Sequence, residues 1–251
     1  TADTQAIADF FLLQREYKEQ RKPLTVKRVN VTGRLHEVFV HYLRQPTRNY
    51  FLKIFQTIVY IDREKPAGHV LVFLTSVEEI EGMVHMLDSS QSKQTQIKLL
   101  PLHAKLAPEA QNLIFEHSYE RKVILSTNIA ESSITIPDIH YVIDSGYVKV
   151  KTFDSFAGID KMCVVPCGKS SANQRAGRAG RVTDGECFRV YHEQGYNSMP
   201  DRLPPEILRI DLTNVVLKLK GLGIADILTF SCWKDLTKGI SQKQSTCSTP
   251  T

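Results

Sequence analysis

The chain has 251 residues, a formal net charge of +5 and a hydrophobic fraction of 42%. This length accommodates one large domain, or a medium domain with extensions. No apolar run approaches the roughly 20 residues of a membrane helix, and the first ten residues lack the basic start and apolar segment of a signal peptide. We therefore expect a globular protein of the nucleus or cytoplasm, without a membrane. The charge permits a polyanionic partner but does not require one.

The five cysteines are scattered along the chain and form no CxxC pair: Cys163, Cys167, Cys187, Cys232 and Cys247. This spacing argues against a zinc ribbon. Reduced thiols in an intracellular protein are the expected state. We predict no metal site within the chain itself.

The first 30 residues predict a helix over about 5–21, followed by a basic linker with Lys22, Lys27 and Arg28. Between residues 70 and 192, short apolar runs alternate with amphipathic stretches. These runs predict five buried strands, at 70–74, 97–100, 123–125, 141–143 and 188–191. Strands separated by helices imply right-handed crossovers, and hence an α/β fold with a mostly parallel sheet.

Two of the intervening helices have start signals. Ser76 precedes a helical pattern with Glu79 three positions later, which predicts a capping box. Pro108 predicts the start of a helix whose apolar face would contain Ala110, Leu113, Ile114 and His117.

Residues 147–166 break this rhythm, because 148–153 alternate with period two before the turn sequence 154–158. The pattern predicts a protruding β-hairpin, and an ordinary surface hairpin is equally compatible with it. After residue 203 the sequence becomes helical again, from Pro204-Pro205 to Gly221 or Gly223. The last twenty residues, rich in Ser, Thr, Lys and Gln, are typical of disorder.

The segment Gln174 to Arg181 reads QRAGRAGR. We expect it to continue a helix capped by Ser170 or Ser171, on which Arg178 and Arg181 are neighbours. Two glycines within a helix would cost about 1 kcal/mol each relative to Ala. Since Arg matches phosphate oxygens with a planar fork, the pattern indicates close approach to an anion. A solvated basic helix face is the alternative.

The segment Ser126 to Ile136 reads STNIAESSITI and follows a buried strand directly. Ligands of open α/β sheets gather at the carboxyl ends of the strands, and small hydroxyl and amide side chains there suit phosphate and ribose oxygens. Local capping by Ser, Thr and Asn is the alternative interpretation.

Together these segments resemble the DEAH-box class of superfamily 2 RNA helicases. Residues 174–181 resemble motif VI, 126–136 resemble motif V, and 71–75 resemble motif IV. Residues 205–209 resemble the sequence that follows the motor domain, and the opening stretch resembles the one after motif III. The resemblance implies a RecA-like second motor domain at 31–202, preceded at 1–30 by the end of the first one and a linker. Residues 203–230 would begin a winged-helix or helical region, with 231–251 disordered.

The resemblance also implies roles for individual residues. Arg178 and Arg181 would be arginine fingers, and Gln174 would help to place the attacking water. Phe115 would stack on the nucleotide base. Thr135 would lie near the ribose, and so would Asp138, although Pro137 occupies the position where the family often has Asp or Asn.

Three further residues, Thr75, Thr127 and Asn128, would touch the RNA backbone by the same resemblance. The hairpin at 147–166 resembles the family's strand-separating element. The implied cofactor is ATP or another NTP with Mg²⁺, whose metal is held mainly by the first motor domain. The implied partners are single-stranded RNA, protein activators or a ribonucleoprotein.

No phosphate loop occurs in the 251 residues, because Cys163 stands where Gly168-Lys169-Ser170 would need a glycine. We therefore expect an ATP-dependent RNA helicase only when the chain is joined to a first motor domain. A catalytically inactive scaffold that binds RNA or protein is the alternative. A viral or DNA-directed superfamily 2 helicase fits the sequence of motif V less well.

Overall fold

The computed structural model describes residues 7–9, 27, 29, 36–90, 97–132, 134–154 and 156–224. The chain divides into two compact units. One comprises Arg34–Val150 and Val164–Leu203, and it contains the central sheet. The other comprises Thr1–Gly33, Lys151–Cys163 and Pro204–Thr251. We describe each unit by itself.

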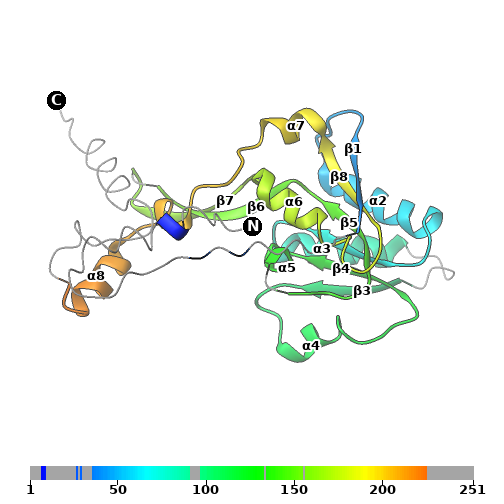
Figure 1. The fold of residues 1–251 in the computed structure, drawn as a ribbon, viewed down its shortest axis with the longest axis horizontal. Helices are drawn as coiled ribbons and strands as arrows, with labels where there is room; N and C mark the ends of the chain where they lie inside the picture. The colour runs from blue at the N-terminus through cyan, green and yellow to red at the C-terminus, as the bar shows by residue number, and fades with distance from the viewer. Residues whose placement is uncertain are drawn as a thin grey trace. The chain divides into compact units, whose positions relative to one another are not determined.

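The larger unit is built on a six-stranded parallel sheet with the strand order β1-β8-β5-β2-β4-β3 (Figure 1). Its strands are β1 (Val38–Leu43), β2 (His69–Phe73), β3 (Ile97–Leu102), β4 (Arg121–Ser126), β5 (Ile139–Asp144) and β8 (Gly185–His192). All five strands that the apolar runs predict are present. The α/β class and the parallel sheet are thus confirmed.

Helices cover both faces of this sheet. One face packs against α2 (Tyr50–Glu64) and α3 (Val77–Ser90), whose inward side chains are fully or almost fully buried: Ile54, Ile58, Ile61, Ile80, Met83 and Leu87. The other face packs against α5 (Ile129–Ser132) and α6 (Lys169–Ala176) through small residues, Ala130 and Ala176. Small side chains let these two helices lie close to the sheet, and so bring motifs V and VI together.

The edge strand β1 and helix α2 precede the first predicted strand and were not expected from the sequence. Half of the six residues of β1 are exposed and the others are partly buried, since β1 is an edge strand that pairs only with β8 among the described residues. In contrast, α2 has an amphipathic pattern that the sequence displays, and its N-cap Asn49 accepts a hydrogen bond from the amide of Leu52.

The predicted helix at Pro108 begins where expected but ends early. Helix α4 spans only Pro108–Asn112 and buries none of its residues. The predicted apolar face is therefore wrong: Ile114 is buried, whereas Leu113 and His117 are exposed. The turns after Asn112 lead the chain away from a helical path and place Ile114 in the core instead.

Residues 147–166 form the predicted hairpin, with strands β6 (Tyr147–Asp154) and β7 (Ile159–Pro166) in a sheet of their own. Its distal part, Lys151–Cys163, groups with the segment after Pro204. The amide of Phe153 donates to the carbonyl of Arg209, and the Arg209 guanidinium donates to the carbonyl of Lys151 at 3.0 Å.

The segment after residue 203 is helical in two pieces rather than one. A 3-10 turn at Glu206–Leu208 is followed by α8 (Thr213–Gly221), and Gly223 then adopts a left-handed φ of 84°. A short helix α7 (Glu193–Ser198) precedes this segment and follows β8. The predicted helix over 5–21 lies outside the described residues except at 7–9, which are helical, and the predicted disorder at the C-terminus also lies outside them.

Candidate nucleotide and RNA interface

The three residues expected at RNA lie together at the carboxyl edge of the sheet. Thr75 follows β2, and Thr127 and Asn128 follow the neighbouring strand β4. The amide of Leu74 donates to the carbonyl of Ser126 at 2.8 Å, which ties the two strand ends together. Thr75 is buried, Thr127 is half-buried and Asn128 is exposed.

Glu79 holds the loop of motif IV in place. The Ser76 hydroxyl accepts a hydrogen bond from the amide of Glu79, as a capping box requires. The Glu79 carboxylate, however, accepts from the amide of Thr75 at 2.8 Å and from the hydroxyl of Tyr50. The predicted bond to Ser76 is therefore present, whereas the reciprocal bond of the Glu79 carboxylate goes to the amide of Thr75 instead of Ser76. Burial and the bond to Glu79 raise the pKa of Tyr50 to about 12.

Motif VI differs from its predicted form. Helix α6 ends at Ala176, so Arg178 and Arg181 lie in the following loop rather than on one helical face. Its N-cap is Gly168, without a side-chain hydrogen bond, and Ser171 instead donates to Glu131 at 2.8 Å.

The two glycines of motif VI also have another explanation than a nearby anion. Gly177 caps the end of α6 and lies outside the helix. A Cβ on Gly180 would lie 2.7 Å from the carbonyl oxygen of His36 and 2.6 Å from Val38. Close packing against the chain at the start of β1 therefore requires this glycine.

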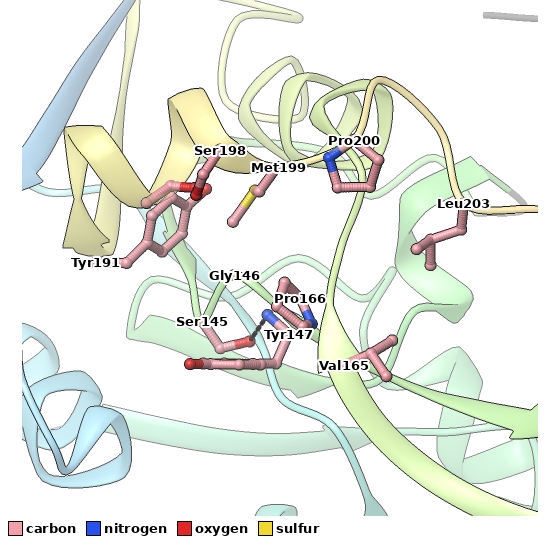
Figure 2. A pocket seen from close by; sticks show the side chains of 11 residues that line it. Ser145, Gly146, Tyr147, Val165, Pro166, Tyr191, Ser198, Met199, Pro200 and Leu203 are labelled. Atoms are coloured by element: carbon pink, nitrogen blue, oxygen red, sulfur yellow. Dashed lines mark hydrogen bonds between the residues drawn. The ribbon is translucent and has the colours of Figure 1, made fainter.

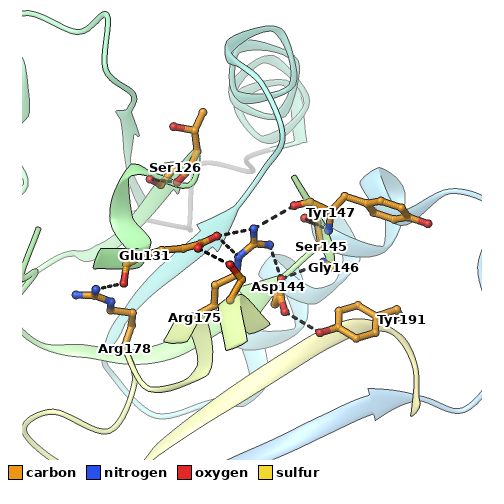
Figure 3. A network of polar contacts seen from close by, with 11 residues as sticks. Ser126, Glu131, Asp144, Ser145, Gly146, Tyr147, Arg175, Arg178 and Tyr191 are labelled. Atoms are coloured by element: carbon orange, nitrogen blue, oxygen red, sulfur yellow. Dashed lines mark hydrogen bonds and ion pairs between the residues drawn. The ribbon is translucent and has the colours of Figure 1, made fainter. Parts of the chain in front are cut away.

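Arg175 is the centre of a buried polar network (Figure 3). Its side chain is 1% exposed and donates to Glu131 at 2.8 Å and to Asp144 at 2.7 Å. It also donates to the carbonyl of Tyr147, the first residue of the hairpin. Tyr191 donates to the other oxygen of Asp144 at 2.7 Å. One guanidinium thus joins motif V, the end of β5 and the base of the hairpin.

The sequence interpretation did not single out this network. Its carboxylates lie 44 and 31 residues before Arg175, so no local spacing reveals them. Burial would lower the pKa of the Arg175 guanidinium, but the two carboxylates outweigh it and raise this pKa. The positive charge of Arg175 is therefore balanced within the fold.

Arg178 has a different environment. It is 8% exposed and donates to the carbonyl of Ile134 at 2.8 Å and to the carbonyl of Glu131 (Figure 3). Burial lowers the pKa of Arg178, and the nearby charge of Arg181 lowers it further. Among the described residues, neither arginine forms an ion pair within 4.0 Å. Two like charges thus lie close together, and the charge of Glu131 offsets their effect on Arg178 only in part.

The residues expected at the nucleotide lie toward the amino ends of the strands. Asp138 immediately precedes β5, has a left-handed φ of 56° and accepts a hydrogen bond from the amide of His69 at the start of β2. Phe115 is 46% exposed and is flanked by two carbonyls that Lys122, near the start of β4, contacts. The loop of Arg181 is bonded to the residues that precede β1.

Two further candidate residues, Thr135 and Gln174, lie after α5 and on α6. Thr135 is exposed and follows Ile134, the residue that Arg178 contacts. Gln174 lies on α6 and is half-buried. Motif V begins at the carboxyl edge of the sheet, and the chain reaches the amino edge at Asp138, two residues after the motif ends. The RNA candidates and the nucleotide candidates therefore lie at opposite edges.

A pocket of about 370 Å³ lies at the carboxyl edge beside the hairpin base (Figure 2). Its wall is mostly apolar, with Tyr147, Pro166, Tyr191 and Met199 among its residues. The pocket separates the first residues of the hairpin from α7 and the chain that follows it.

In the part of the chain that the structure describes, no helix is both long and apolar enough to cross a bilayer. In the same residues, no three His, Cys, Asp or Glu side chains are grouped so that they could hold a metal ion.

The comparisons with known proteins agree with this geometry. Residues 51–183 match the helicase conserved C-terminal domain. The chain is 38% identical to the probable ATP-dependent RNA helicase DHX35 of Homo sapiens over 238 residues, which cover 92% of this chain and 34% of that protein. The Pongo abelii protein of the same name is also 38% identical, with 33% of its length covered.

A solved structure has the same fold. The crystal structure of the E. coli DExH-box NTPase HrpB matches with a TM-score of 0.71 and 27% identity, over 85% of this chain and 26% of that one. The chain thus spans about a third of the length of the curated relatives it matches. The RecA-like fold, the motif VI sequence and these matches together show that the chain belongs to the helicase conserved C-terminal domain family, in its DEAH-box RNA helicase form.

Proposed function

We propose that the chain is the second motor domain of an ATP-dependent RNA helicase, and that it supplies arginine fingers to NTP hydrolysis. The observation that carries this proposal is the contrast within motif VI. Arg175 forms ion pairs with Glu131 and Asp144, whereas Arg178 and Arg181 lie near each other and form no ion pair among the described residues. Guanidinium groups without an ion-pair partner are suited to the charge that develops on a transferred phosphoryl group.

The remaining nucleotide contacts are proposed from the family resemblance. Gln174 would orient the attacking water, Phe115 would stack on the base, and Thr135 and Asp138 would face the ribose. The residues present fit part of an NTP site, because they offer positive charge and an exposed aromatic ring. When bound, ATP with Mg²⁺ supplies the phosphoryl group, and we assign the metal ligands mainly to a first motor domain.

The opposite edge of the sheet is the proposed RNA surface. Thr75, Thr127 and Asn128 would contact phosphate and sugar groups, which position a strand without reading its bases. RNA is therefore the proposed partner, with protein activators or a ribonucleoprotein as further partners. An intracellular location in the nucleus or the cytoplasm accompanies this function.

Steady-state ATP hydrolysis, measured with and without single-stranded RNA, tests the proposal. We expect RNA-stimulated hydrolysis by the full-length protein that contains this chain. The 251-residue chain alone should hydrolyse no ATP, because its sequence has no phosphate loop or acidic metal-binding motif. A full-length protein that binds RNA but hydrolyses no NTP would instead be a scaffold. RNA-stimulated hydrolysis by the chain alone would also contradict the proposal.

A further inference from the structure

Lys122 is a buried lysine near the start of β4. Its whole residue is 1% exposed, which is rare for lysine. The ammonium group donates to the carbonyl of Ile114 at 3.0 Å and to the carbonyl of Glu116. Among the described residues, Lys122 forms no ion pair within 4.0 Å. The direct contacts of the buried ammonium group are thus two carbonyls, and the charges of Glu116 and Asp138 offset its burial only in part.

This arrangement is costly for the fold. Removing an ammonium group from water disfavours its charged form. Burial accordingly lowers the pKa of Lys122, and the charge of Lys98 on the neighbouring strand lowers it further. An apolar side chain would fill this position without that cost. The hydrogen bonds of the ammonium group to the two carbonyls therefore give a reason for a lysine at this position.

The two carbonyls lie on either side of Phe115. Helix α4 ends three residues before Phe115 and contributes no buried side chain, so packing fixes this stretch weakly. Ile114 is the one residue of 113–116 that enters the core. The Lys122 ammonium binds the backbone before and after Phe115, as a cation satisfies the unpaired carbonyls at the end of a helix. Phe115 itself remains 46% exposed.

We propose that Lys122 is a positioning residue that fixes the turn presenting Phe115, and thereby sets the affinity of the motor for the nucleotide base. This inference rests on the proposed role of Phe115 as the stacking platform. A platform held rigidly loses less conformational freedom when the base binds. Lys122 would thus act on base binding and have no part in the chemistry at the phosphates.

A double-mutant cycle in the full-length protein tests the proposal. The variants are Lys122→Met, Phe115→Ala and the double variant, and Lys98→Met is the matched control, since Lys98 pairs with Lys122 in the register of β3 and β4. Their kcat and KM for ATP are measured at saturating RNA. Inorganic tripolyphosphate, which has no base, is measured as a competitive inhibitor, and thermal unfolding reports the folded fraction.

Base stacking of ordinary strength predicts that Phe115→Ala and Lys122→Met each raise the KM for ATP about tenfold, with kcat changed less than about twofold. The double variant should be no worse than Phe115→Ala alone. Inhibition by tripolyphosphate should stay unchanged, and Lys98→Met should behave as the unaltered protein.

Three outcomes would overturn the proposal. An unchanged KM in Lys122→Met with a raised KM in Phe115→Ala would remove Lys122 from base binding and leave the platform intact. Equal losses of ATP and tripolyphosphate affinity would show a general structural defect. An unchanged KM in Phe115→Ala would remove the platform itself, while the arginine-finger proposal would still stand on its own hydrolysis measurements.

Discussion

The arginines in two neighbouring stretches of motif VI have different partners. On α6, Arg175 is 1% exposed and is matched by the carboxylates of Glu131 and Asp144. In the loop that follows, Arg178 is also buried, yet its hydrogen bonds go to backbone carbonyls and its pKa is lowered by burial and by Arg181. The comparison separates an arginine that completes the fold from arginines that we propose act on the nucleotide.

The same division extends across the sheet. The carboxyl edge gathers short polar side chains at Thr75, Thr127 and Asn128, whereas the amino edge carries Asp138 and the stretch around Phe115. The network around Arg175 lies between motif V and the hairpin base. A parallel sheet can therefore keep a proposed RNA surface and a proposed nucleotide surface apart while motifs V and VI connect them.

The largest expected effect is on hydrolysis by Arg178→Ala in the full-length protein. The rate should fall on the order of 10³-fold or more, by analogy with arginine fingers. Nucleotide affinity should change much less, because the finger acts on transition-state charge. Some stability should also be lost, since the carbonyls of Glu131 and Ile134 lose their donor. Near-normal turnover would make Arg178 a structural residue like Arg175.

Replacing Arg175 should act on stability first. Arg175→Met leaves Asp144 and Glu131 without their cation, and breaking such a buried pair costs about 3–5 kcal/mol. Chemical denaturation should show this loss in the free energy of unfolding. Arg63→Met, at an exposed position of α2, is the control and should change it by less than about 0.5 kcal/mol. Equal stability of the two variants would contradict the structural role of Arg175.

The hairpin should matter for strand separation but not for hydrolysis. Deletion of residues 154–158 should spare RNA-stimulated ATP hydrolysis in the full-length protein and impair duplex unwinding, because a wedge acts at the duplex junction. Lys161→Met, which breaks the ion pair with Asp154 but keeps the hairpin, is the control. If the shortened protein unwinds duplexes at the normal rate, the hairpin is only a surface feature.

The smallest expected effect is on RNA binding. Thr127→Ala should weaken binding of single-stranded RNA about two- to tenfold, the range of one lost hydrogen bond, and should do so equally for all sequences. Affinity should fall as salt is added. Thr183→Ala, an exposed threonine in the loop of motif VI, should leave binding unchanged. Strong preference for one sequence would indicate base reading and contradict the proposed surface.

The sequence revealed the buried parts of the fold more readily than its margins. Strands such as β2 and β4 are continuous apolar runs because both of their faces are covered. The edge strand β1 lacks that signature, since half of its residues are exposed and none is fully buried. The end of α4 was misplaced because Leu113 and Ile114 match a helical period, whereas turns redirect the chain after Asn112.

The sequence indicated candidate site residues only where one short segment contains all the residues of a motif. The octapeptide of motif VI made Arg178 and Arg181 candidates, and their role stays a prediction. Their placement beyond the end of α6, and the packing reason for Gly180, needed the three-dimensional contacts with His36 and Val38. The importance of Arg175 and Lys122 could not be recognised from the sequence, because the tertiary fold determines which groups they contact.

The most direct test of the central claim is single-turnover ATP hydrolysis by Arg181→Ala in the full-length protein, with saturating ATP and RNA. Arg181 is half-buried and lies outside the network of Arg175. Arg181→Ala should therefore remove a positive charge without lowering the stability of the fold. We expect a hydrolysis rate lower by on the order of 10³-fold, with unchanged thermal unfolding and nearly unchanged ATP binding. Hydrolysis at the normal rate, or a loss explained by unfolding, would contradict the claim that this domain supplies charge to the reaction.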